Sequence, residues 1–303
     1  MVMQKLGYID LPEHLGAGGF DHADVHAPSD RLYVAHTGND AVDVIDCAKD
    51  RYIESIPGLK AVAGALVSEA GGLVFTSNRG ENTVSVFAPH GEREAFKIAV
   101  GMKPNGLAFD AQRGILIAAN VGDPAIAGSH TVSVVDVARR ERIAEIEVPG
   151  RTRWARETVV VKIAAPARII AIDARNPTRI TMQYEVPAAG PHGLDLDPAT
   201  GQLLCACDAG LLMAMDAASG RVLGEVSLSG APDVIFLHPP SQHLYVAIGD
   251  PGVIDVVDIG KMRRQEVVPT EAGAHTLALD RKRNKIYAFL PHSHRAAVFR
   301  DTA

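Results

Sequence analysis

The stretch that decides the fold is AAGPHGLDLDPATGQLLCACDAG, residues 188–210. In it His192 stands between a proline and a glycine, just ahead of an alternating apolar run that breaks at a short polar turn and then resumes. Similar segments begin at Phe20, Gly101 and Gly273. The stretch is therefore one copy of a repeat, and the question is what the repeat does with the residue at the position of His192, which we call the slot.

The repeat has a period of about forty residues when the copies are aligned on the slot. Each copy holds an alternating run, a polar turn, a β-rich run and two further β-rich runs, which predicts four short antiparallel strands. A period of this length built from strands is typical of propeller blades. The aligned slot residues are His22, Ala63, Asn105, Trp154, His192, Asp233 and His275.

Seven slots predict an all-β fold, a seven-bladed β-propeller with four-stranded antiparallel blades in a single domain, residues 1–303. The last copy has three strands, and residues 5–11 read as the missing outer strand, which would close the ring and cover its open edges. Few residues follow Trp154 before the next strand, so the fourth blade is expected to be shortened or distorted. The blades are placed at about 20–59, 60–101, 102–150, 151–188, 189–230, 231–273 and 274–301 plus 5–11.

The composition and charge of the chain limit the kinds of partner and cofactor that it is expected to bind. The chain has 303 residues, is 47% apolar and carries a formal net charge of -6, which gives no overall attraction for nucleic acid or an acidic membrane. No signal peptide or long apolar span is recognisable, so we expect a soluble, cytoplasmic protein without a membrane association. There is no nucleotide, flavin or haem signature. Cys205 and Cys207 fall on one strand face, where packed apolar thiols are commoner than a soft-metal site.

Polar side chains are expected to gather on one face of the propeller. The loops that enter the first strands and those that join second to third strands open on the same side, and the loop after Asn120 is about twice as long as its counterpart after Asn78. Inserted loops on a rigid scaffold often carry function. The side chains expected at this mouth are His22, His36, Asn105, His130, His192, Asp233, His275, His292 and His294.

Four consecutive blades carry His192, Asp233, His275 and His22 in their slots. Three imidazoles and a carboxylate suit a divalent metal ion of unknown identity, with one position left for water. Without a metal, the same groups are suited to acid and base catalysis near neutral pH. The alternative is structural, because a histidine in the slot can simply bond a neighbouring blade and order the entry to the first strand.

Cations lie close to the same mouth. Lys60, Lys103, Arg151 and Arg153 fall in loops that enter first strands, and Trp154 beside them offers a flat apolar wall. Arginine binds carboxylates and phosphates at two points, so this group favours an anionic organic ligand, with Asn105, His36 and His130 as further contacts. The alternative is that these cations are only solvated, as most loop arginines are.

The opposite face is basic at residues 138–142, 261–264 and 281–285. Such a patch is compatible with nucleic acid, although no aromatic residues are interleaved with its cations. Charged turns also serve solubility, so contact with nucleic acid is the lesser alternative. Nothing in the sequence indicates the oligomeric state.

The slot, GLALD-like runs, LYVA segments and TVSV-type strands resemble the YVTN-repeat propellers, including YncE-like proteins, and more distantly the lactonase and cycloisomerase-type propellers. The resemblance covers nearly the whole chain and implies the propeller fold, but propellers host unrelated activities. The sequence leads to two functional hypotheses. The first is binding of a small anionic molecule in the axial funnel, with or without a divalent metal, and lyase, isomerase or hydrolase chemistry on it. The second is a non-catalytic scaffold that binds a protein or nucleic acid.

Overall fold

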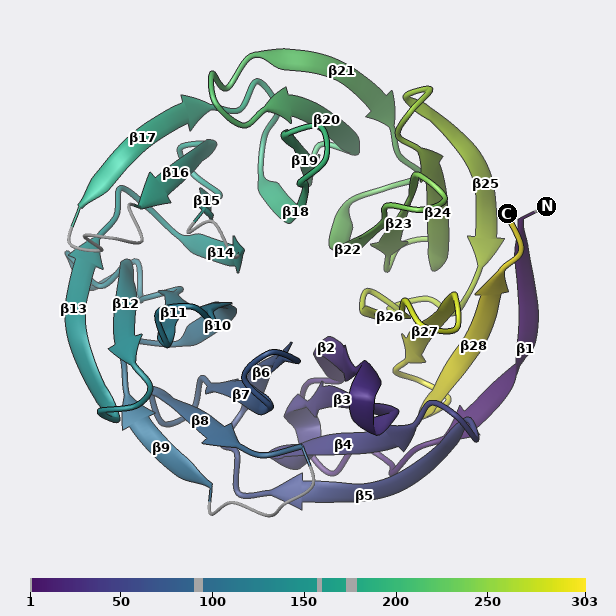
Figure 1. Cartoon of the computed structure of the whole chain (residues 1–303), viewed down its shortest axis with the longest axis horizontal. Coiled ribbons are helices and arrows are strands. Elements are labelled where there is room, and N and C mark those ends of the chain that lie inside the picture. Colours follow the sequence, from purple (N-terminus) through teal and green to yellow (C-terminus); the bar gives the residue numbers. More distant parts are fainter. Residues whose placement is uncertain (1, 90–94, 157–159, 173–178) are drawn as a thin grey trace.

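A computed structural model describes residues 2–89, 95–156, 160–172 and 179–303, without the side chains of 153–156 and 160–162. In this described part of the chain, seven four-stranded antiparallel sheets surround a central axis (Figure 1). The expected all-β propeller is thus confirmed. We number the blades from the one that contains His22.

The first four blades follow chain order from the axis outward. Blade 1 holds β2 (Phe20–His26), β3 (Arg31–His36), β4 (Ala41–Asp46) and β5 (Arg51–Pro57), with 3-10 turns η1 (Ala27–Ser29) and η2 (Thr37–Asn39). Blade 2 holds β6 (Val62–Ser68), β7 (Leu73–Asn78), β8 (Thr83–Phe87) and β9 (Phe96–Ala99). Blade 3 holds β10 (Pro104–Asp110), β11 (Ile115–Asn120), β12 (Thr131–Asp136) and β13 (Glu141–Glu147). Blade 4 holds β14 (Thr152–Arg156), β15 (Val160–Ile163), β16 (Arg168–Ile172) and β17 (Ile180–Glu185).

The remaining blades complete the ring. Blade 5 holds β18 (Pro191–Asp197), β19 (Gln202–Cys207), β20 (Leu211–Asp216) and β21 (Val222–Ser227). Blade 6 holds β22 (Pro232–His238), β23 (His243–Ile248), β24 (Val253–Asp258) and β25 (Arg263–Pro269). Blade 7 holds β26 (Leu277–Asp280), β27 (Lys285–Leu290), β28 (Arg295–Asp301) and, as its outer strand, β1 (Met3–Asp10).

The two ends of the chain lie side by side in blade 7 (Figure 1). β1 pairs antiparallel with β28 from Met3↔Asp301 to Asp10↔Arg295, with a register shift between Lys5 and Gly7. The N-terminal strand therefore starts two residues earlier than the predicted 5–11 and ends before Leu11. Its backbone groups satisfy the edge of β28, which would otherwise be an open template for aggregation.

Blade 4 is a complete sheet, although its first two strands are short. β14 has 5 residues and β15 has 4, whereas β18 and β19 of blade 5 have 7 and 6. The expected distortion is thus a shortening of strands, and no strand is lost.

The hydrophobic core consists of separate clusters between neighbouring blades. One cluster joins blades 7 and 1 through Ile9, Phe20, Leu32 and Phe289. Another joins blades 5 and 6, with Leu204 against Ile235. Alternation of side chains along each strand puts one apolar set on each sheet face, and each set packs against the next blade. The inner strand of each blade borders the central axis (Figure 1).

A polar clamp also holds the last strand against blade 6. The Asp301 side chain is buried and accepts hydrogen bonds from Tyr245 Oη at 2.5 Å and from His243 Nδ1 at 2.6 Å. Burial by itself would raise the pKa of Asp301, but the bonds from Tyr245, the Ala303 N–H and His243 outweigh it, so the pKa lies below its ordinary value.

This clamp should make stability depend on pH. Because the folded pKa of Asp301 is below the unfolded value of about 4, its contribution is complete above that value and is lost as pH falls through the folded pKa. We expect Asp301→Asn to lower the free energy of unfolding by about 1.5–3 kcal/mol at pH 7. The difference from wild type should shrink towards about pH 3. Urea denaturation at both pH values measures this, with Asp10→Asn, at an 84% exposed side chain, as the control. An equal loss at both pH values would contradict it.

Candidate functional site

The strand registers identify the slot residue in each blade. The last pair between the inner and second strands is Asp197↔Gln202 in blade 5, His238↔His243 in blade 6 and Asp280↔Lys285 in blade 7. In each of these blades the slot lies five residues before the first member of that pair. The same count in blade 1, where the pair is His26↔Arg31, ends on Asp21. The slot of blade 1 is therefore Asp21, one residue before the predicted His22.

The pairing of the inner strand with the second strand breaks at the slot. The register of the inner strand shifts between Phe20 and Ala23 in blade 1, and between Pro191 and Gly193 in blade 5. Such irregularities turn a side chain out of the regular alternation. In blades 1, 5 and 6 the slot side chain lies at this break, outside the regular alternation of the strand.

His192 is held between two carboxylates. Its Nδ1 lies 2.7 Å from Asp208 Oδ1 and its Nε2 lies 3.0 Å from Asp233 Oδ1. Ionised carboxylates only accept hydrogen bonds, so this arrangement favours a ring with a proton on both nitrogens. A cavity of about 530 Å³ opens beside the three side chains and is also bordered by Asp250 and His275.

Asp233 is the electrostatic centre of the group. Burial alone would raise the pKa of its carboxyl, but His192, followed by His22 and His275, outweighs burial and holds the pKa far below its ordinary value. Burial lowers the pKa of His22, an effect that Asp21 and Asp233 oppose and Arg79 reinforces. Three of the predicted arc histidines thus act on one ionised carboxylate.

His275 is held differently from His192. Its Nδ1 lies 2.8 Å from the carbonyl oxygen of Gly273. A carbonyl only accepts, so Nδ1 is the donor of this bond and Nε2 takes no part in it. His275 lines the same cavity as His192. One cavity is therefore bordered by a histidine whose two nitrogens face carboxylates and by a histidine whose Nδ1 is bonded to a backbone carbonyl.

Arg79 bridges the gap that Ala63 leaves in the slot ring. Its Nη1 lies 3.5 Å from Asp21 Oδ2, and its Nη2 donates to Asn105 Oδ1 at 2.5 Å. Because alanine is the slot residue of blade 2, the arginine that follows β7 can reach the slots of both neighbouring blades. This places Asn105, as predicted at the mouth, in a polar network with Asp21.

Three residues of this site were missed in the sequence: Asp21, Arg79 and Asp208. Arg79 and Asp208 each follow directly on the last residue of a second strand, Asn78 and Cys207. The polar position after the second strand is thus a usable signal. The sequence prediction used the strand-end residues, such as Asn78, and not the residues that follow them.

Other predicted mouth residues have partners elsewhere. His36 is fully buried, with Nδ1 2.7 Å from Asp43 and Nε2 2.6 Å from His14 Nδ1. The ring of His14 also packs against that of His294 at 4.5 Å. His130 Nδ1 lies 2.5 Å from the Val121 carbonyl inside the blade 3 insertion. These histidines hold loops together and do not border the two cavities described for this chain.

Two of the four predicted cations form ion pairs with carboxylates. Lys103 pairs with Asp123 at 3.1 Å and Lys60 pairs with Asp40 at 2.6 Å. Arg151 is exposed. The side chains of Arg153 and Trp154 lie outside the described part of the structure, so their proposed contacts remain predictions.

The predicted metal site is not supported by the donor geometry. Among the described residues, no three His, Cys, Asp or Glu side chains are arranged to hold a metal ion. At His192 the reason is visible, because both ring nitrogens already face carboxylate oxygens. Cys205 and Cys207 are buried in the core with Met213, as the packing hypothesis expects.

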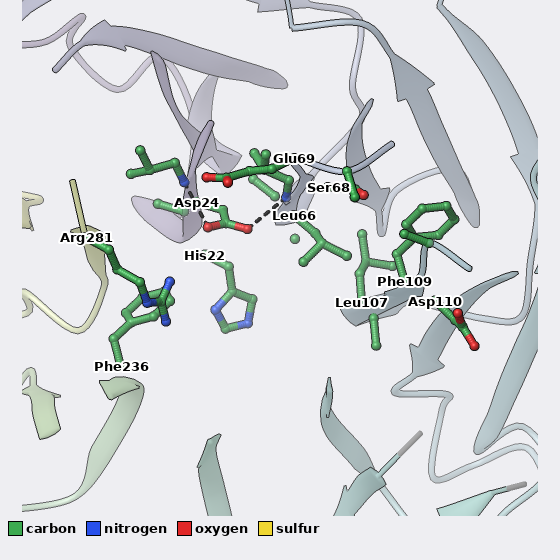
Figure 2. Close-up of a pocket in the computed structure, with 18 of the residues that line it drawn as sticks. His22, Asp24, Leu66, Ser68, Glu69, Leu107, Phe109, Asp110, Phe236 and Arg281 are labelled. Carbon is green, nitrogen blue, oxygen red and sulfur yellow. Dashed lines mark hydrogen bonds between the residues drawn. The ribbon is translucent and has the colours of Figure 1, made fainter. Parts of the chain in front are cut away.

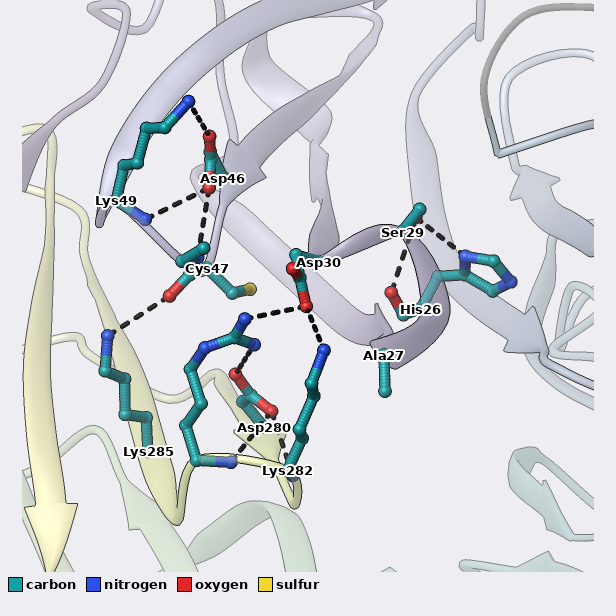
Figure 3. Close-up of polar contacts among 12 residues, drawn as sticks. His26, Ala27, Ser29, Asp30, Asp46, Cys47, Lys49, Asp280, Lys282 and Lys285 are labelled. Atoms are coloured by element: carbon teal, nitrogen blue, oxygen red, sulfur yellow. Dashed lines mark hydrogen bonds and ion pairs between the residues drawn. The ribbon is translucent and has the colours of Figure 1, made fainter.

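The basic turns on the opposite face are largely neutralised. Lys282 Nζ lies 2.8 Å from Asp30 Oδ1 (Figure 3), and Arg283 Nη2 lies 2.7 Å from the same oxygen. Lys285 reaches Asp50 at 2.6 Å, across the junction of blades 7 and 1. These turns therefore join two blades, and this accounts for much of their charge.

A second, larger cavity lies at the other end of the inner strands. It measures about 690 Å³ and is lined by the carboxyl ends of β2, β6 and β10 and the turns that follow them, with Phe236 and Arg281. Figure 2 shows Arg281 and Phe236 on one side and Leu107 and Phe109 on the other, with His22 between them.

Comparisons with known proteins support the fold and no more. No protein-family model and no curated protein matches this chain. A chain from the solved structure of Kuenenia stuttgartiensis hydrazine synthase is similar, with a TM-score of 0.83, 15% sequence identity, and 97% of each chain covered. In the described part of the chain no helix is long and apolar enough to cross a membrane. The resemblance to the YVTN-repeat family thus stays a prediction, while the β-propeller fold is shared with a solved structure.

Proposed function

We propose that this β-propeller binds a small polar organic molecule at the cavity beside His192 and transfers a proton to or from it. The observation that carries the proposal is the pair of histidines on this cavity. Both nitrogens of His192 face carboxylates, those of Asp208 and Asp233, which favours a doubly protonated ring, whereas His275 uses only Nδ1 in its bond to the Gly273 carbonyl, so that Nε2 is the nitrogen that can accept a proton. An acid and a base on one cavity are the elements of isomerase and lyase chemistry.

The roles follow from these contacts. His275 Nε2 is the candidate base, because its lone pair is the one left by the Nδ1 bond. His192 is the candidate acid. Asp233 stabilises the positive charge of its ring and keeps the ring oriented after a proton has left. The side chain of Asp208, which is 37% exposed, holds His192 Nδ1 from the solvent side.

The charge of the cavity favours a ligand that carries hydrogen-bond donors or a cationic group. Three carboxylates, those of Asp208, Asp233 and Asp250, border it together with the two histidines. Of the four cations from which the sequence predicted an anionic ligand, Lys60 and Lys103 face carboxylates. A metal-dependent version has no support in the donor geometry, so we propose metal-independent proton transfer.

The alternative of a non-catalytic scaffold for protein or nucleic acid is weaker. Its nucleic-acid version depended on the basic turns, and the cations at 282, 283 and 285 are paired with carboxylates of blade 1. Paired surface charges offer little to a polyanion unless the pairs open first.

A ligand screen tests the proposal. We expect a panel of small amines, amino alcohols and hydroxy ketones, followed by ligand-observed NMR, to yield compounds whose dissociation constant rises at least about tenfold in Asp233→Asn. For a bound ketone, exchange of the carbon-bound proton next to the carbonyl in D₂O should slow by at least about a hundredfold in His275→Gln, while binding changes little.

His238→Gln is the matched control, because His238 is a buried histidine bonded to Ser241 at 2.8 Å, away from this cavity. It should leave binding and exchange unchanged. Failure of every compound to distinguish wild type from Asp233→Asn would contradict binding at this cavity, and exchange that survives in His275→Gln would contradict the assigned base.

A further inference from the structure

The cavity at the far end of the inner strands is separate from the proposed proton-transfer site in its lining. The first cavity is formed by the slots and second-strand ends of blades 5, 6 and 7. The far cavity is formed by the carboxyl ends of inner strands in blades 1, 2 and 3, with Phe236 of blade 6 and Arg281 of blade 7. The two share no lining residue, and at about 690 Å³ the far cavity is large enough for a small organic molecule.

Much of the far cavity wall is apolar. Leu66 and Leu107 project from β6 and β10, and Phe109 packs on Phe75 with ring centroids 4.6 Å apart. Phe236 faces them from across the cavity in Figure 2. These side chains can cover the hydrocarbon part of a ligand, and burial of apolar surface is the main source of affinity in such pockets.

The acidic groups of the wall are already engaged by the protein. Asp24 accepts the backbone N–H groups of Val25 and Val67, each at 2.8 Å. Asp110 pairs with Arg113 at 2.6 Å. The Glu69 carboxylate accepts the Ala27 N–H at 3.2 Å at the rim. These bonds offset the negative charge and hold the carboxylates in place.

Arg281 is in a different position. Among the described contacts its guanidinium makes one hydrogen bond, a long one of 3.4 Å to the Leu237 carbonyl, and no ion pair. Arginine has five N–H donors in a planar fork that fits a carboxylate at two points. The other cation of the wall, Arg113, is paired. The far cavity thus combines one unneutralised guanidinium with an apolar wall.

We propose that the far cavity binds a small organic carboxylate with an apolar body. Arg281 binds the carboxylate at the rim, and Leu66, Leu107 and Phe236 contact the body. This site shares no lining residue with the proton-transfer site, and it gives the anionic ligand expected from the sequence a place at the other end of the inner strands.

Sodium hexanoate is the probe that tests this site, with hexylammonium chloride as a cation of the same length. In ligand-observed NMR titrations of the full chain, we expect hexanoate to bind saturably with a dissociation constant of roughly millimolar order. Hexylammonium should bind at least about tenfold more weakly. Arg281→Gln should weaken hexanoate at least about tenfold, and Arg281→Glu should reverse the preference between the two probes.

Lys282→Gln is the matched control, since Lys282 lies in the same turn, is 52% exposed and does not line the cavity. It should leave hexanoate binding unchanged, as should Asp233→Asn at the other site. The proposal is overturned if hexanoate shows no saturable binding, if hexylammonium binds wild type equally well, or if Arg281→Gln has no effect. Weakening by Asp233→Asn without weakening by Arg281→Gln would place hexanoate at the other cavity and also overturn it.

Discussion

Deletion of residues 1–11 is expected to leave a chain that is largely unfolded or aggregated at room temperature. The deletion removes β1 and with it the apolar side chains of Met3, Ile9 and Leu11, which are 4%, 3% and 8% exposed. Each buried side chain of this kind stabilises by about 1.5–3 kcal/mol. Their sum is comparable with the whole stability of an ordinary domain, about 5–15 kcal/mol. The deletion also uncovers the edge of β28 along its full pairing with β1.

Circular dichroism melts and urea denaturation measure this effect. Tyr8→Ala is the control within the same strand, because Tyr8 is 51% exposed and should cost less than about 1 kcal/mol. If the truncated chain does not fold, addition of a peptide of residues 1–12 should restore the native spectrum. A truncated chain that melts within about two degrees of wild type would show that β1 contributes little to the ring.

The second large effect is expected at Asp43, in the core of blade 1. Asp43 and His36 are both fully buried, with Nδ1 of the ring 2.7 Å from the carboxylate. Ser55 Oγ donates to the other carboxylate oxygen at 2.6 Å, and His36 Nε2 continues the network to His14 at 2.6 Å. Removal of one member of such a buried network leaves the others without partners.

Asp43→Leu should therefore lower the free energy of unfolding by about 3–5 kcal/mol. The double variant His36→Leu with Asp43→Leu should lose much less than the sum of the two single changes, because the orphaned partner is removed as well. Ser55→Ala, which removes one hydrogen bond, should cost about 1 kcal/mol and serves as the calibrating control. Losses at Asp43 and His36 that simply add would contradict a network and restore His36 to the list of candidate ligand contacts.

The double variant His36→Leu with Asp43→Leu also tests whether His36 contributes to ligand binding. If His36 is only structural, the surviving folded fraction of the double variant should bind ligands at the His192 cavity as wild type does. This separates the role predicted for His36 in the sequence from the role that its contacts indicate.

The sequence by itself determined the class of fold and the order of the strands. Alternation of apolar residues along runs such as GLDLD, together with polar turns, dictates short strands with two apolar faces, and a period of about forty residues predicts blades around an axis. It also predicted that His192, Asp233 and His275 lie near one another, since their blades are consecutive. The pKa of Asp233 is lowered by both histidines, as that placement requires.

Only the tertiary structure decided which residues complete the site. The pairing of β2 with β3, which ends at His26↔Arg31, shows that Asp21 and not His22 occupies the slot of blade 1. Asp208 joins the site because a loop closes back onto His192. Arg79 joins because Ala63 leaves room beside it. Such contacts are made between residues far apart in the chain, and their geometry is set by how neighbouring blades pack.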